Sequence, residues 1–356
     1  MASVTRLLRN SPAGRYNGFG SVGPSDNLPL GTENPAMRQG LLLEALVSLG
    51  LLVVPPSLVL AGKPAQDQTE AIAVPGEIGP AVLDGHDLYV LAGGKELLRV
   101  DLATHKVAPV VRFPEGQAPQ LLGVSGSRAC VAARDGKGDT HLHVIDLAGG
   151  QIVRTIDQAP PASGGIGFVA GDLLYVVDGQ GVKIVEIATG RPRHVVAVKG
   201  GVLMGCHQVG DRLYVAREYA GGLAVIDLKE GKLLDLIETR DWLFQVQVVG
   251  DGAFVWGSFK GLGRIDLETR QYQALQQPEP DNANHHYAIL AGPGKRLLVL
   301  GQKAVYEYDA RGRRIGGTPL PAAAPRTLAG VWNGRAVLVG KDTVSLVELG
   351  KTTKPR

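Results

Sequence analysis

An acidic residue recurs at a nearly constant spacing between residues 101 and 348. Each of these acids closes a short apolar run and is followed by a turn of small and polar residues. The average spacing is about 41 residues, and the acids are Asp101, Asp146, Glu186, Asp227, Asp266, Asp309 and Glu348. A period of this length, made only of β-type segments, is typical of four-stranded propeller blades. Because the acid is present in every unit, we expect it to bind backbone amides in the turn that follows, and not to take part in catalysis.

The fourth unit shows the pattern most clearly. Leu213–Ala216 and Leu223–Leu228 are apolar runs separated by the turn glycines Gly221 and Gly222. With Met204–Val209 before them and Leu233–Glu238 after them, the unit contains four strands, which we name A to D in chain order. The 49 glycines and 22 prolines of the 356-residue chain suit so many turns. The units start near Ile78, Pro119, Gly165, Leu203, Phe244, His286 and Thr327.

The last unit lacks a fourth strand. Thr327–Trp332, Ala336–Gly340 and Val344–Leu349 supply strands A to C, and only a basic tail follows, at 351–356. An apolar strand without a unit, Glu70–Pro75, precedes the first unit. An open ring would expose unpaired strand edges. The sequence therefore predicts an all-β fold over 70–350, a seven-bladed β-propeller closed by the N-terminal strand.

The residues before 70 differ in composition from the repeats. Residues 1–36 are polar and rich in Gly, Pro, Ser and Asn, which predicts disorder or a segment upstream of the true start. Residues 37–61 contain a basic start and an apolar run that ends at Ala61, the order of parts found in a signal peptide. Residues 62–69 form a polar linker.

Two alternatives to a cleaved signal stay open for residues 37–61. The run could remain as a signal anchor, although Glu44 and Pro55-Pro56 are unfavourable in a membrane helix. The three arginines before Asp26 also fit a mitochondrial presequence. With a cleaved signal or an anchor, the repeats are exported, to the periplasm or the exterior. The start is either Met1 or Met37.

The repeats resemble a known family in several phrases. Leu88-Tyr-Val, Leu174-Tyr-Val and Leu223-Ala-Val-Ile-Asp-Leu, with turns such as Ala188-Thr-Gly190, resemble the YVTN-type repeats and the wider quinoprotein-like and lactonase-like propellers. The resemblance covers about residues 70–350 and implies a seven-bladed propeller. Members of that group include binding proteins, lactonases and quinone-dependent dehydrogenases. Because no Trp closes each repeat and no vicinal cysteine pair occurs, we expect no quinone cofactor.

Histidines are the candidate metal ligands. They lie at or near the strands expected to line the central channel, and they are His207, His285 and His286. Imidazole suits zinc or copper, so a divalent metal is the cofactor that these residues would fit. Successive strand residues point to opposite faces, so at most one of His285 and His286 lines the channel. The alternative is that all three are hydrogen-bonded or exposed histidines. Cys130 and Cys206 lie in different units and are expected to be separate buried thiols.

Cations follow the B strands in six of the seven units. They are Lys95, Arg134, Arg217, Lys260, Lys303 and Lys341. Because all B–C turns of a propeller emerge on one side, these charges would favour an anionic ligand there. The alternative is that turns simply need solvated residues, and acids such as Asp135, Glu218 and Asp342 reduce the net charge.

An asymmetric patch is the third candidate. The connection that enters the sixth unit, Gln276–Asn284, is longer than its counterparts, and Trp242 and Phe244 stand at the same edge of the fifth unit. Loops on a rigid scaffold commonly carry binding sites.

These observations predict an exported binding or scaffold module for a protein, a cell-surface component or an anionic ligand. The alternative is a lactonase-like hydrolase or a quinoprotein-like oxidoreductase with its site at the channel mouth. No HExxH, CxxC or Gly-x-Ser-x-Gly motif occurs, and a net charge of +3 gives no signal for nucleic acid. We expect a monomer that touches a membrane only if residues 41–61 are retained.

We predict that the mature chain starts near Gly62, because small residues precede it at the end of the apolar run. The intact mass of protein recovered from its native cell measures this. A mass that includes residues 41–61 would contradict cleavage, and recovery from the cytosol would contradict export.

Overall fold

The computed structural model describes residues 70–156, 166–170, 172–178, 181–198, 203–219, 221–279, 288–320 and 327–350. Within these ranges every regular element is a β-strand, and none of the described residues forms a helix that could cross a membrane. The segments at 1–36, 37–61, 62–69 and 351–356 lie outside the described residues, so the predictions about them stay predictions.

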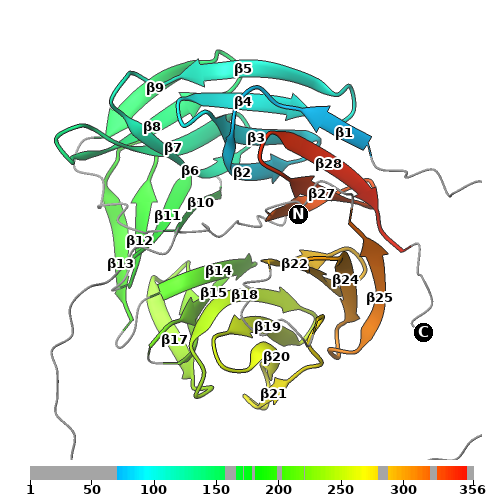
Figure 1. The fold of residues 1–356 in the computed structure, drawn as a ribbon. Helices are drawn as coiled ribbons and strands as arrows, with labels where there is room; N and C mark the ends of the chain where they lie inside the picture. Colours follow the sequence, from blue (N-terminus) through cyan, green and yellow to red (C-terminus); the bar gives the residue numbers. More distant parts are fainter. Residues whose placement is uncertain are drawn as a thin grey trace, which may run out of the picture. The chain divides into compact units, whose positions relative to one another are not determined.

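The strands form seven four-stranded antiparallel sheets, the blades (Figure 1). Blade 1 contains β2 (Ile78–Asp84), β3 (Asp87–Ala92), β4 (Glu96–Asp101) and β5 (Lys106–Arg112). Blade 2 contains β6 (Ala118–Ser125), β7 (Arg128–Arg134), β8 (Thr140–Asp146) and β9 (Gln151–Ile156). Blade 3 contains β10 (Ile166–Ala170), β11 (Leu173–Asp178), β12 (Gly181–Glu186) and β13 (Pro192–Ala197).

The remaining blades follow the same order. Blade 4 contains β14 (Leu203–Val209), β15 (Arg212–Arg217), β16 (Gly222–Asp227) and β17 (Lys232–Ile237). Blade 5 contains β18 (Leu243–Val249), β19 (Gly252–Gly257), β20 (Gly261–Asp266) and β21 (Tyr272–Ala274). Blade 6 contains β22 (Ala288–Gly292), β23 (Arg296–Leu300), β24 (Ala304–Asp309) and β25 (Arg314–Pro319). Blade 7 contains β26 (Thr327–Trp332), β27 (Arg335–Val339), β28 (Thr343–Glu348) and β1 (Glu70–Ala73).

The N-terminal strand completes blade 7, as predicted. β1 pairs antiparallel with β28, with Glu70 opposite Leu346 and Ala73 opposite Thr343. Ile72 is buried in the core between blades 7 and 1, and the Arg335 guanidinium donates a hydrogen bond to the Glu70 carboxylate at 2.7 Å. The composite blade therefore joins both ends of the propeller.

The recurring acid has the structural role that its spacing predicts. It is the last residue of strand C in all seven blades. The Asp101 carboxylate accepts hydrogen bonds from the backbone N–H groups of Ala103 and Thr104, both at 2.9 Å. Asp227 and Asp266 bind two amides of their own turns in the same way. The Asp146 and Asp309 carboxylates also accept turn amides, so the acid stabilises the C–D turns of blades 1, 2, 4, 5 and 6 in this way.

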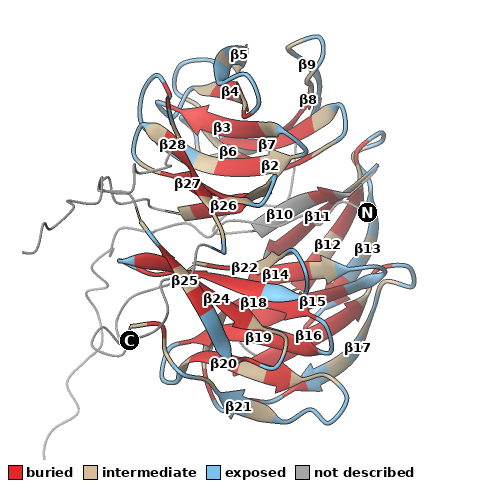
Figure 2. Cartoon of the chain, turned by 90° about the vertical axis from the view of Figure 1, so that its right-hand side faces the viewer, coloured by how far each residue is buried: buried red, intermediate tan, exposed pale blue. Residues whose placement is uncertain are grey.

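Seven apolar cores, formed by described residues, lie between neighbouring blades. In the core between blades 7 and 1, Val90 of β3 and Val337 of β27 are fully buried. Strands β15 and β19 are buried along almost their whole length, whereas the outer strands β13 and β17 carry exposed positions (Figure 2). Each blade thus buries one face against the preceding blade and the other against the next.

Side chains also bridge the inner strands of blades 4, 5 and 6. Nδ1 of His207 accepts a hydrogen bond from the backbone N–H of Val248 at 2.8 Å. The side-chain oxygens of Gln245 and Gln247 accept the N–H groups of Ile289 and Ala291 at 3.0 and 3.1 Å. An inner strand is a sheet edge with unpaired amides, and these contacts satisfy several of them.

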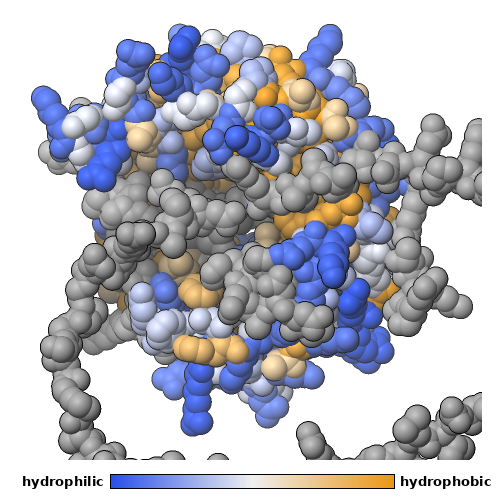
Figure 3. All heavy atoms as spheres, in the orientation of Figure 1, coloured by the Kyte–Doolittle hydropathy of each residue, from blue (hydrophilic) through white to orange (hydrophobic). Residues whose placement is uncertain are grey.

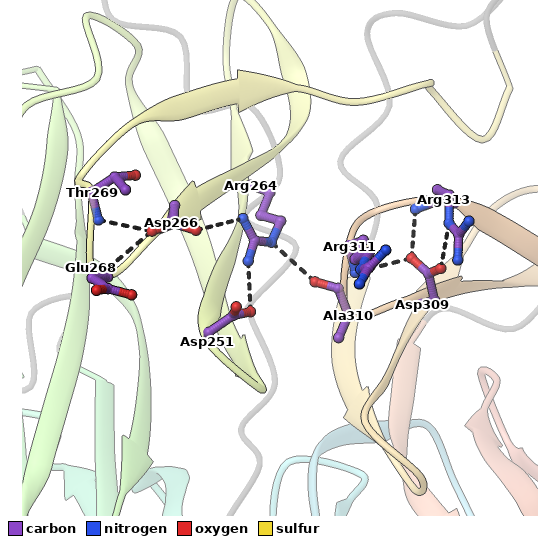
Figure 4. A network of polar contacts seen from close by, with 9 residues as sticks. All are labelled: Asp251, Arg264, Asp266, Glu268, Thr269, Asp309, Ala310, Arg311 and Arg313. Carbon is purple, nitrogen blue, oxygen red and sulfur yellow. Dashed lines mark hydrogen bonds and ion pairs between the residues drawn. The ribbon is translucent and has the colours of Figure 1, made fainter.

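An arginine joins blades 5 and 6 on the side of the C–D turns (Figure 4). Arg264 donates to Asp251 at 2.7 Å and to Asp266 at 3.3 Å within its own blade. Its Nε donates to the backbone oxygen of Ala310, in the next blade, at 3.0 Å. This side of the two blades is therefore held by a shared polar network.

We predict that deletion of residues 70–75 lowers the free energy of unfolding by at least about 4 kcal/mol, because the burial of Ile72 and Val74 is lost and β28 keeps only β27 as a partner strand. Chemical denaturation measures the change, and deletion of residues 1–36 is the control, for which we expect no effect. Equal stability of the 70–75 deletion and the parent chain would contradict closure by β1.

Candidate functional site

The described parts of the B–C hairpins and of the D–A connections lie on one side of the propeller, which we call the hairpin face. Two contacts between neighbouring segments show this. Asp241, in the connection from blade 4 to blade 5, binds the backbone N–H groups of Phe259 and Lys260 in the B–C hairpin of blade 5. Glu279, after β21, accepts the N–H of Lys303 in the B–C hairpin of blade 6 at 2.9 Å.

The structure places all six predicted cations at B–C hairpins. Five have exposed side chains: Lys95, Arg134, Lys260, Lys303 and Lys341. Arg217 differs, because it is 5% exposed at the end of β15, where burial lowers the pKa of its guanidinium. The expected ring of six therefore presents five exposed cations.

Several of these cations have neighbours that moderate their charge. Nζ of Lys95 lies 3.6 Å from a carboxylate oxygen of Glu115, and Arg134 donates to the backbone oxygen of Gly138 at 3.2 Å. Nζ of Lys260 lies 4.8 Å from the centre of the Tyr272 ring. The face is therefore positive in patches, with acids between the cations.

Three aromatic side chains meet at the seam between blades 4 and 5. The Trp242 ring lies 5.0 Å from the Tyr219 ring and 5.2 Å from the Phe259 ring, both at 62° between planes. Tyr219 belongs to the B–C hairpin of blade 4 and Phe259 to that of blade 5. We call these three residues the aromatic cluster.

The sequence predicts that Trp242 shares a patch with Phe244, whereas the aromatic cluster joins Trp242 to Tyr219 and Phe259. Phe244 is half-buried and packs against the core between blades 5 and 6. One sequence signal identifies the two missed residues, since Tyr219 and Phe259 each follow the end of their B strand by two positions. The connection Gln276–Asn284 is described only to Glu279.

Eight large hydrophobic side chains are exposed among the described residues. Figure 3 shows one face, on which hydrophobic residues gather in patches among hydrophilic ones. Tyr219 and Phe259 are 60% and 68% exposed, and both are among the most exposed large apolar side chains of the described residues.

The predicted histidine site is only partly described. His285 and His286 lie outside the described residues, so their convergence with His207 stays a prediction. His207 is 4% exposed, and burial lowers its pKa to about 4. Its Nδ1 is an acceptor, and its Nε2 has no hydrogen-bond partner in the described part of the chain. His207 is therefore a neutral imidazole with a structural contact.

A second group of potential metal ligands already forms hydrogen bonds within the chain. His86, Asp87 and Asp101 have ligand atoms within 4.8 Å of one another. Arg99 donates to Asp87 at 2.9 Å, however, and Asp101 binds the amides of its turn. These two carboxylates therefore stabilise the hairpins of blade 1.

The two cysteines are separate, as predicted. Cys130 and Cys206 are both buried, and neither forms a disulfide. Burial raises the pKa of the Cys130 thiol to about 12, so this thiol is protonated and unreactive at neutral pH.

Seven four-stranded antiparallel blades closed by a composite blade define a seven-bladed β-propeller. No protein-family model matches the chain and no curated protein matches it, so the resemblance to YVTN-type and quinoprotein-like repeats stays a prediction. Solved propellers do match in structure at low identity, which shows the fold alone.

Three of these structures cover most of the chain. "YCF48 bound to D1 peptide" has a TM-score of 0.61 at 12% identity and covers 81% of this chain and 97% of its own. The WD40 propeller of Doa1 has a TM-score of 0.61 at 10% identity, with coverages of 79% and 96%. A chain of the mitotic checkpoint complex has a TM-score of 0.60 at 10% identity, with coverages of 86% and 99%.

We predict that His207 makes the propeller sensitive to acid. Its folded pKa of about 4 lies below the unfolded value of 6.5, so between these values the unfolded chain binds the proton and the folded chain does not. Between pH 7 and pH 4 the free energy of unfolding should fall by up to about 3 kcal/mol from this group.

The variant His207→Gln isolates this contribution, because a glutamine oxygen can still accept the Val248 N–H and does not titrate. Denaturant unfolding at pH 7 and pH 4 should show a smaller loss for this variant than for the parent chain. His86→Gln, at an exposed position, is the control. Identical pH dependence in all three proteins would show that His207 titrates normally.

Proposed function

We propose that this propeller is a binding module that holds an acidic region of a protein partner on its hairpin face. The observation that carries the proposal is the set of five exposed cations, one each at the B–C hairpins of blades 1, 2, 5, 6 and 7. Charges of one sign on one face add to a common field and speed the encounter with an oppositely charged partner.

The positions of the hairpins support recognition of a large ligand. The hairpin backbones are fixed by contacts with neighbouring segments, such as Lys303 N–H to Glu279 and Ile78 N–H to the Lys341 carbonyl at 2.6 Å. The cations therefore extend from a rigid frame into solvent. In physiological salt the Debye length is about 8 Å, so each charge acts only on groups close to the face. A partner that touches several hairpins gains from several cations at once.

Propellers of the same fold support a protein as the ligand. One of them was solved with a D1 peptide, and another belongs to a checkpoint complex. We extend protein binding from those molecules to this chain as part of the proposal.

We also propose that the protein acts outside the cytoplasm, in the periplasm or secreted, or held at a membrane if residues 41–61 are retained. The order of basic, apolar and small residues from Met37 to Ala61 supports export. The enzyme alternative has no specific support among the described residues, where His207 is buried and the carboxylates near His86 bind the chain itself.

We predict that poly-L-glutamate binds the full-length chain and that the double variant Lys260→Glu, Lys303→Glu binds it at least about fivefold more weakly. Fluorescence anisotropy of labelled poly-L-glutamate, at about 20 mM and about 150 mM salt, measures the affinity. Added salt should weaken binding to the parent chain.

The matched control reverses two exposed lysines at the C–D turns, Lys106→Glu and Lys229→Glu, with the same change in net charge. If the control weakened binding as much as the hairpin variant, net charge and not the hairpin face would govern it. If neither added salt nor either variant changed the affinity for poly-L-glutamate, the cations would be ordinary solvated turn residues.

A further inference from the structure

We infer that the aromatic cluster is a docking point for an extended segment of a partner protein, with a proline or aromatic side chain as the anchor and an acidic residue beside it. The inference rests on the proposed function, because the cluster lies on the hairpin face. Its three rings differ from the hairpin cations, although Lys260 belongs to both sites, so a variant that removes only the rings tests this inference separately.

The exposure of the aromatic cluster is the first observation. Phe259 is 68% and Tyr219 60% exposed, and Trp242 connects them into one surface across two blades. The other large apolar side chains exposed in the described ranges are aliphatic: Val153, Val195, Val209, Leu234, Leu236 and Ile315. Grouped exposed apolar residues mark interaction sites, and aromatic residues dominate the binding energy of protein interfaces.

The second observation is that hydrogen bonds fix the backbone segments that carry Trp242 and Phe259. Asp241 is 0% exposed, and its carboxylate accepts the N–H groups of Phe259 at 2.9 Å and of Lys260 at 3.1 Å. The N–H of Ser258 donates to the backbone oxygen of Trp242 at 2.8 Å. A Cβ atom at Gly257 would lie 2.2 Å from the Asp241 carboxylate, so only glycine fits there. Because Asp241 and Trp242 are consecutive, one short segment fixes both the Phe259 hairpin and the central ring.

Backbone strain at the same place is the third observation. Tyr219 has φ of 41° and Arg240 has φ of 54°, in the left-handed region that favours glycine. Such strain is concentrated at functional sites, where the surrounding structure maintains it. Here the strained residues are an exposed aromatic ring of the cluster and a cation two positions before Trp242.

The geometry of the rings selects the kind of partner. Both ring pairs meet edge to face, so the three rings do not lie in one plane. Aromatic rings set at an angle to one another can contact a prolyl or aromatic side chain on two sides, as in proline-rich recognition. A sugar ring stacks best on one flat ring face, which rings at an angle offer less well. We therefore assign the site to a peptide segment.

The charges around the aromatic cluster indicate which kind of residue lies beside the anchor in the partner segment. Arg240 and Lys260 are exposed next to it. Two of the nearby acids are less available, since the Asp241 carboxylate is occupied by two amides and burial raises the pKa of Glu218; Glu238 is exposed. An acidic residue beside the anchor would pair with Arg240 or Lys260.

A phage-displayed library of random heptapeptides, selected on the full-length chain, tests the inference. Selected clones are then measured on the double variant Tyr219→Ser, Phe259→Ser and on the matched control Val153→Ser, Val195→Ser, which removes two exposed apolar side chains from β9 and β13. Melting temperatures within about 2 °C of the parent would show that both variants are folded.

We expect enriched peptides that contain proline or an aromatic residue next to Asp or Glu. They should bind the aromatic variant at least about tenfold more weakly and the control variant unchanged. No enrichment, or peptides that bind the aromatic variant as well as the parent, would overturn the inference. Enriched peptides without acids would overturn the assignment of the flanking residue.

A glycan array, with the same variants, tests the other class of ligand. Glycan binding that depends on Tyr219 and Phe259 would overturn the assignment to a peptide. Loss of poly-L-glutamate binding in the lysine variant together with peptide binding that ignores the aromatic variant would contradict this inference and leave the proposed function standing. Peptide binding that is lost in the aromatic variant, together with poly-L-glutamate binding that is unchanged in the lysine variant, would contradict the proposed function and leave this inference standing.

Discussion

Each blade of this propeller buries its apolar faces only against the two blades beside it. The cores lie between sheets, so no blade has a complete core of its own. The structure therefore depends on closure of the ring, and closure depends on the pairing of β1 with β28. The inner strands depend on their neighbours as well, since His207, Gln245 and Gln247 each satisfy a backbone amide of the next blade.

The fold could be predicted from the sequence because its signals are local and repeated. In blades 1, 4 and 5 the acid at the end of strand C interacts with amides two or three residues away. Because such a contact is local, the spacing of the acids alone gives the register of the blades. Closure followed from one missing strand and one extra strand. The contact of His207 could not be predicted in this way, because its partner Val248 lies 41 residues away and the acceptor role depends on the facing blade.

The candidate site shows the same limit. The cations were found because each lies at or after the end of a B strand, but the repeat pattern does not predict that Arg217 is 5% exposed. The aromatic cluster was missed because its residues come from three different connections. Asp241 looks in the sequence like one more polar loop residue, whereas in the structure it is fully buried and shapes the hairpin of the next blade. Contacts between neighbouring blades differ from one blade to the next, and the repeat pattern of the sequence does not predict them.

The composite blade also affects how the chain reaches its fold. Six blades form from consecutive strands, whereas Arg335 and Glu70, which bond within blade 7, are separated by 265 residues. During synthesis β1 emerges first and has no partner until β28 has been made, near the end of translation. Contacts of such long range form slowly, and an unpaired strand edge can associate with other chains while it waits. We therefore expect blade 7 to form last and to open first, which makes it the seam where misfolding of this protein would begin.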